Sequence, residues 1–111
     1  MDSSKRSHHR LPITLPIELM YQGRSIMGAT RNLSLGGMFI TCNEAVPHGA
    51  RVQLRFDLET LGRSVTTDAI VRWVESASGI GVQFTGLRAQ EVWGLQRLIE
   101  RHLENAGTGA Q

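Results

Sequence analysis

The chain has 111 residues, of which 41% are hydrophobic and 20% charged, with a formal net charge of +2. A chain of this length forms one domain, because it can bury roughly 60–70% of its unfolded surface around one core. The small net charge excludes a polycation. The basic side chains are eleven arginines and one lysine, and the planar guanidinium of arginine suits the recognition of phosphate and guanine.

Alternation of apolar and polar residues, which is typical of half-buried strands, runs through the first three quarters of the chain. Its first segment carries Pro12 and Pro16 on the polar face. Proline cannot donate to a sheet ladder, so this strand is predicted at an edge or a barrel seam. The predicted strands are residues 13–21, 24–32, 37–42, 51–58, 63–74 and 80–84.

The fifth of these strands contains a break in its alternation. Odd-numbered residues from Val65 to Trp73 share one face, but Ile70 and Val74 place apolar side chains on the other. The break predicts a β-bulge, or a second face that another element covers. Trp73 and Trp93 are both expected to pack in the core or between the barrel and a helix.

After Gly86 the period of the apolar residues changes to that of a helix, from Val92 to Leu103. Asn105 and Gly107 are predicted to end it. Six short antiparallel strands followed by one amphipathic helix predict a mainly β fold, a six-stranded barrel with the helix over one opening or side. A small barrel has no cleft of its own, so a ligand must bind at its surface or mouth.

Two polar stretches precede predicted strands. In "KRSHHR", residues 5–10, Arg6 and Arg10 point to the same side of an extended arm, about 13 Å apart at ~3.3 Å per residue. In "NLSLGG", residues 32–37, an amide, a hydroxyl and two glycines stand close together. Each stretch also has a plainer interpretation. The first can be a solvated basic arm, and the second a bulged loop whose side chains bond to their own backbone.

Taken together, the two stretches match the patterns RxxxR and [D/N]xSxxG, in this order and about 22 residues apart. The pair resembles the PilZ domain, a six-stranded barrel that binds the bacterial second messenger cyclic di-GMP. The resemblance covers roughly residues 5–104 and includes the "AIVRWV" and "GIGVQF" strands and the C-terminal helix. The matching residues are Arg6 and Arg10 in the first motif and Asn32, Ser34 and Gly37 in the second.

The chemistry of the motif residues suits such a ligand, which presents two guanines and two phosphates. A guanidinium fork matches guanine N7 and O6 and also grips phosphate, so Arg6 and Arg10 can each serve either group. Asn32 can pair with a guanine edge. The family more often has aspartate there, which accepts from both N1–H and the N2 amine, whereas an amide accepts with one oxygen.

The remaining candidates contact the ligand through a hydroxyl, the backbone or a second charge. The Ser34 hydroxyl can bond to phosphate. Gly36 and Gly37 let backbone amides approach the ligand closely and tolerate positive φ. Lys5 is an auxiliary candidate, because it directly precedes RxxxR. In the family, the residue at this position is associated with whether one ligand or an intercalated pair of ligands binds.

The sequence argues against several other classes of protein. The single cysteine, Cys42, excludes an internal disulfide and fits a reducing compartment. No signal peptide or membrane span is evident, which predicts a cytoplasmic protein without membrane insertion. The scattered histidines do not suggest a metal site, and no nucleophile is paired with a base, so neither a cofactor nor catalysis is expected.

The resemblance therefore implies a non-catalytic receptor that binds cyclic di-GMP and then contacts an unidentified effector protein. Residues 1–10 are predicted to be a flexible arm that the ligand orders, residues 11–104 the barrel and helix, and residues 105–111 a disordered tail. Two alternatives stay open: a PilZ-like protein-interaction domain without ligand binding, and a small nucleic-acid-binding barrel. Nucleic acid is the less expected partner, because the strand aromatics have mostly inward parity.

Overall fold

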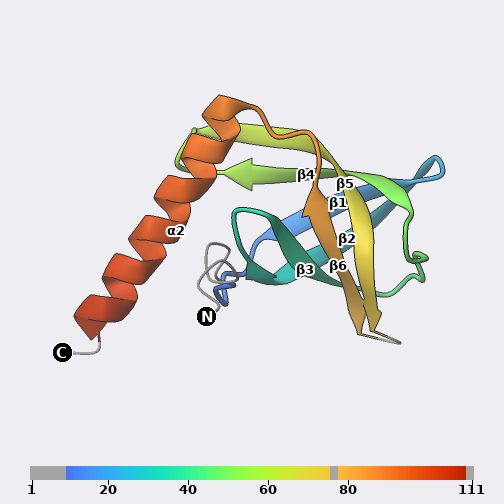
Figure 1. Ribbon diagram of the computed structural model, residues 1–111, viewed down its shortest axis with the longest axis horizontal. Coiled ribbons are helices and arrows are strands. Elements are labelled where there is room, and N and C mark those ends of the chain that lie inside the picture. The colour runs from blue at the N-terminus through green and yellow to red at the C-terminus, as the bar shows by residue number, and fades with distance from the viewer. Residues whose placement is uncertain (1–9, 76–77, 110–111) are drawn as a thin grey trace, which may run out of the picture.

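The structure is a computed structural model that describes residues 10–75 and 78–109, and in these residues six antiparallel strands close into a barrel followed by one helix (Figure 1). The strand order around the barrel is β1-β2-β3-β6-β5-β4. This confirms the predicted fold. The elements are β1 (Pro16–Tyr21), β2 (Arg24–Leu33), β3 (Gly37–Cys42), β4 (Arg51–Leu58), β5 (Arg63–Glu75), β6 (Gly79–Phe84) and α2 (Ala89–Gly109).

Alternating side chains from the strands fill the interior of the barrel. In β4 the alternation is complete, with Val52, Leu54, Phe56 and Leu58 buried and the residues between them exposed. Such a pattern places every second side chain inside, so the barrel has a packed core rather than a channel.

The segment before β1 runs beside the end of β2, and β1 therefore begins later than predicted. Leu11 and Leu33 exchange two backbone hydrogen bonds of 2.9 Å each. The buried hydroxyl of Thr30 donates to the carbonyl of Ile13 at 2.6 Å. These bonds fix the chain at residues 11–13 and place Arg10 next to the end of β2.

Two β-bulges change which side chains face outward. The register shifts between Thr30 and Asn32 where β2 pairs with β3, and between Val71 and Trp73 where β5 pairs with β6. The bulge predicted in β5 is confirmed. The prediction that Trp73 packs in the core or between the barrel and a helix is wrong, because the extra residue reverses the alternation and leaves this side chain 54% exposed.

Helix α2 is attached to the hairpin between β4 and β5 through its first turns. The backbone of Gly94 lies against Leu58 and Leu61, and its carbonyl accepts a hydrogen bond of 2.5 Å from the Thr60 hydroxyl. Leu95 is buried beside these contacts. The rest of the helix extends past the end of the barrel, as Figure 1 shows in orange to red.

Two predictions about the helix need correction. It continues to Gly109, through Asn105 and Gly107, where the sequence predicts its end and a disordered tail. Glycine inside a helix costs only about 1 kcal/mol relative to alanine, so it does not by itself end the helix. Trp93 is 53% exposed rather than packed on the barrel, because it lies about 200° around the helix from Leu95.

A buried carboxylate, Glu91, stabilises the first turn of α2. One of its oxygens accepts from the backbone N–H of Arg88 at 2.9 Å, and the other lies 3.7 Å from Nη1 of Arg63. We expect Glu91→Ala to lower the free energy of unfolding by about 1–2 kcal/mol, because the helix loses this capping bond. Chemical denaturation measures the change, with the half-exposed Glu100→Ala as control; equal losses in both variants would contradict the capping role.

Candidate functional site

A row of paired residues crosses four neighbouring strands on the outside of the barrel. Asn32 of β2 pairs with Phe39 of β3, Phe39 with Gly81 of β6, and Gly81 with Trp73 of β5. Phe39 is only 7% exposed, yet it stands outside the core cluster to which both of its neighbours in β3 belong. Its side chain is therefore covered by other residues on the outer surface.

A second row lies beside the first and joins Ala29, Thr41, Gly79 and Glu75. In both rows the β6 residue is a glycine, so the outer surface of this strand carries no side chain at these two positions. We call this surface the outer trough: the exterior of β3 and β6, between the ends of β2 and β5. Three strand spacings of about 4.8 Å separate β2 from β5, which makes the trough about 14 Å wide.

Trp73 lies directly on the backbone of β6. A Cβ atom added to Gly81 would stand 2.6 Å from Cε3 of the indole. The glycine therefore leaves the space that the ring occupies, and the side chain stays 54% exposed. An exposed indole on a rigid sheet is a suitable stacking surface for a planar ligand.

Two arginines lie in the outer trough, each over an aromatic ring. The guanidinium of Arg10 is 5.3 Å from the centroid of the Trp73 ring and donates to Oδ1 of Asn32 at 2.7 Å. The guanidinium of Arg31 is 4.0 Å from the centroid of the Phe39 ring. Ring faces attract cations, so the two aromatic side chains help to position both positive charges in the trough.

Arg31 also reaches across β3 and β6 to the far side of the trough. Its Nη2 donates to Oε1 of Glu75 at 3.1 Å. The side chains are 48% and 52% exposed, respectively, and ion pairs this exposed typically contribute less than about 1 kcal/mol. A ligand can therefore compete for either partner at little cost in stability.

Two hollows adjoin Trp73. The smaller has a volume of about 220 Å³ and is lined by Arg10, Trp73 and the loop that contains Ser34, Gly36 and Gly37. The larger has a volume of about 430 Å³ and is lined by both arginines and both aromatic residues together with Asn32, Val74 and Glu75. Positive charge, an amide, a carboxylate and one exposed stacking surface thus meet in one region.

In the loop between β2 and β3, the Ser34 side chain forms hydrogen bonds with the backbone of the same loop. Ser34 is 2% exposed, and its Oγ accepts from the backbone N–H groups of Gly36 and Gly37 at 3.2 Å each. Neither glycine has a positive φ. A Cβ at Gly37 would overlap the carbonyl oxygen of Val82, so the closeness of β6 explains this glycine. The bonds match the plainer interpretation of the motif, and ligand contacts of this loop stay predictions.

The family model described as the PilZ domain matches residues 4–104. The chain belongs to the PilZ family. Both motifs that predict the ligand site lie within the matched range, and so do all six strands of the barrel. No curated protein matches the chain significantly.

Solved structures of PilZ proteins have the same fold. The PilZ domain of Escherichia coli YcgR with c-di-GMP superposes with a TM-score of 0.70 at 17% identity, over 96% of this chain and 97% of that one. The Bacillus subtilis inhibitor of motility MotI/DgrA superposes with a TM-score of 0.73 at 20% identity, over 89% of this chain and 52% of that one. The PilZ domain of CeSA from a cellulose-synthesizing bacterium superposes with a TM-score of 0.64 at 25% identity, over 86% of this chain and 98% of that one. The chain thus spans about half of the MotI chain.

The structure brings together the described part of the predicted PilZ site and adds to it. The predicted residues that meet are Arg10, Asn32, Ser34, Gly36 and Gly37. Lys5 and Arg6, with most of the predicted arm, lie outside the described residues. The residues that the structure adds are Arg31, Phe39, Trp73 and Glu75. The broken alternation of β5 opposite the glycines of β6 is the sequence signal that could have placed Trp73 outside.

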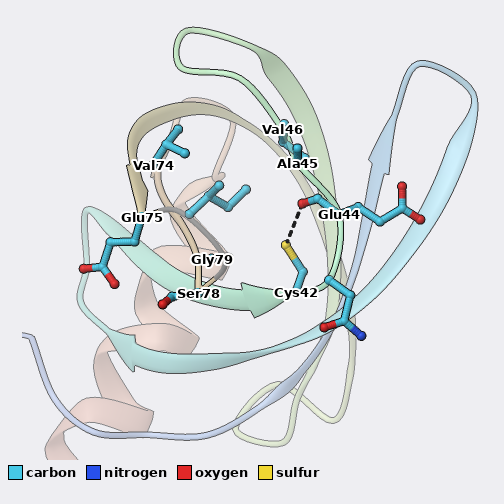
Figure 2. A pocket seen from close by; sticks show the side chains of 10 residues that line it. Cys42, Glu44, Ala45, Val46, Val74, Glu75, Ser78 and Gly79 are labelled. Atoms are coloured by element: carbon cyan, nitrogen blue, oxygen red, sulfur yellow. Dashed lines mark hydrogen bonds between the residues drawn. The ribbon is translucent and has the colours of Figure 1, made fainter.

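A further hollow, of about 490 Å³, lies at the end of β3 and the start of β6 (Figure 2). It contains no motif residue of the PilZ family. Cys42 lines it half-buried, with Sγ 3.6 Å from the carbonyl oxygen of Glu44. Across the described ranges, no three histidine, cysteine or acidic side chains are grouped to bind a metal, and no helix is long and apolar enough to cross a bilayer.

Proposed function

We propose that this PilZ chain is a non-catalytic receptor for cyclic di-GMP and that the ligand binds in the outer trough. One contact supports this most directly: Arg10 of RxxxR donates to Asn32 of NxSxxG, 22 residues away, beside the exposed Trp73. The described parts of both motifs therefore adjoin a surface suited to a base. The ligand class is supported by a PilZ relative, the YcgR domain, which was solved with c-di-GMP.

The groups in the trough complement a dinucleotide with two phosphates. Trp73 presents an indole face, and stacking of one base on an aromatic side chain is worth about 1–3 kcal/mol. Arg10 supplies a fork for phosphate or for guanine N7 and O6. Because Oδ1 of Asn32 accepts from Arg10, its NH₂ group is the part that can donate to a base or a phosphate.

The same proposal gives the N-terminal arm a role in signalling. The Leu11–Leu33 bridge holds the chain at the edge of the trough. From there, the arm supplies the second fork through Arg6 and an auxiliary charge through Lys5, and the bound ligand orders it. Arm and ligand together then form a surface for an effector protein, whose identity is not specified by these residues.

Isothermal titration tests the ligand. We expect saturable heat with cyclic di-GMP at micromolar protein and none with GTP or cyclic di-AMP. GTP lacks the second base, and adenine has a different hydrogen-bonding edge. Absence of heat with cyclic di-GMP would instead favour a PilZ domain that only contacts proteins.

A second candidate function is binding of single-stranded nucleic acid. The exposed Trp73 beneath Arg10 favours it, because aromatic faces and cations are what such barrels use. An oligonucleotide titrated in parallel separates the two. Binding of the oligonucleotide in place of the cyclic dinucleotide would overturn the receptor proposal.

A further inference from the structure

We propose that Glu75 is the residue that selects guanine in the outer trough. The inference rests on the proposed function and adds the group that distinguishes the base. Guanine presents two adjacent donors, N1–H and the N2 amine, and one carboxylate can accept both. Adenine presents an acceptor at N1, which a carboxylate repels.

The described motif residues do not supply this acceptor. Arg10 and the backbone amides are donors, and the oxygen of Asn32 already accepts from Arg10 at 2.7 Å. The Ser34 hydroxyl is buried and bonded to its own loop. Around Trp73, the carboxylate that lines the larger hollow belongs to Glu75.

The position of Glu75 suits a base stacked on Trp73. The two residues are two apart in β5 and follow the bulge, so they lie on the same face, about 7 Å from each other along the strand. Gly79 pairs with Glu75 and Gly81 with Trp73, so no β6 side chain stands between them and the trough. A purine that stacks on the indole can therefore direct its edge toward the carboxylate.

Arg31 makes a carboxylate compatible with a ligand that carries two phosphates. It donates to Oε1 of Glu75 at 3.1 Å while its guanidinium lies on the Phe39 ring. A carboxylate can accept about four hydrogen bonds, so this contact leaves capacity for two guanine donors. The positive charge of Arg31 offsets the repulsion between the carboxylate and the phosphates.

The test compares two ligands in titrations of wild type and Glu75→Gln. Cyclic di-GMP has the N2 amine, and cyclic di-IMP, with hypoxanthine in place of guanine, lacks it. We expect wild type to prefer cyclic di-GMP. Glu75→Gln keeps the size of the side chain but leaves it only one acceptor oxygen. In this variant cyclic di-GMP should bind about 5- to 150-fold more weakly, which is the range for one bidentate base contact. Cyclic di-IMP should lose much less, so the preference shrinks.

Glu100→Gln is the matched control, since Glu100 forms a comparably exposed ion pair with Arg97 on α2 and lines neither hollow that contains Glu75. Melting curves verify the fold of both variants. An unchanged ratio of the two dissociation constants in Glu75→Gln would overturn the inference, including the case in which both ligands weaken equally because Glu75 only positions Arg31. Failure of wild type to bind cyclic di-GMP would instead refute the proposed function on which the inference rests.

Discussion

Replacing Arg10 with alanine should weaken binding of cyclic di-GMP by about 5- to 150-fold, the effect of losing one bidentate contact. The substitution removes the hydrogen bond to Asn32 and the contact with the Trp73 ring, and leaves the core untouched because Arg10 is exposed. The melting temperature should therefore stay close to that of wild type. Titration calorimetry and a thermal melt measure the two quantities.

Two further variants sharpen this experiment. Arg10→Lys should restore little affinity, because an ammonium group lacks the planar fork of a guanidinium. Arg55→Ala is the control, since this exposed arginine of β4 lies near Glu18, away from the trough, and should bind the ligand as wild type does. Wild-type affinity in Arg10→Ala, or unfolding of the barrel, would show that Arg10 does not serve the ligand.

Gly37→Ala should lower the free energy of unfolding by about 3 kcal/mol, at the upper end of the usual cost of overpacking. The new Cβ would overlap the carbonyl oxygen of Val82. That oxygen belongs to the backbone of β6, which cannot move away without disturbing the β3–β6 ladder. Chemical denaturation measures the loss, and a change smaller than about 0.5 kcal/mol, typical of surface substitutions, would contradict the steric argument.

Gly81→Ala is the comparison that separates structural from ligand-related glycines. Its Cβ would meet the Trp73 ring at 2.6 Å, and this ring lies at the surface and can turn away. We therefore expect a smaller loss of stability than for Gly37→Ala but a clear loss of affinity, because the indole leaves its position over β6. Weaker ligand binding by Gly37→Ala would not by itself demonstrate a ligand contact at Gly37, because this variant is also expected to destabilise the barrel.

The alternation of β4 is sufficient to predict a barrel strand, because burial there follows the sequence residue by residue. The outward position of Trp73 could not be predicted in the same way. It depends on the pairing of β5 with β6, where Val71 faces Val82 and Trp73 then faces Gly81. A sequence shows that the alternation breaks, but the register between two strands determines which side chains change face.

The two motifs mark part of the candidate site in the sequence. Asn32 and Arg10 each stand in a recognisable pattern, and the structure places them in contact. Arg31 and Glu75 could not be paired in advance. They are 44 residues apart and meet across two intervening strands, over a part of β6 where Gly79 carries no side chain.

The bulge in β5 divides one strand between two kinds of evolutionary constraint. From Val65 to Val71, odd-numbered residues are buried, and any substitution there is judged by how well the core repacks. From Trp73 to Glu75, the side chains face solvent and the trough. Substitutions at this end of the strand can therefore change which ligand the trough binds without altering the core. The same barrel can in this way acquire different ligand preferences while it keeps its stability.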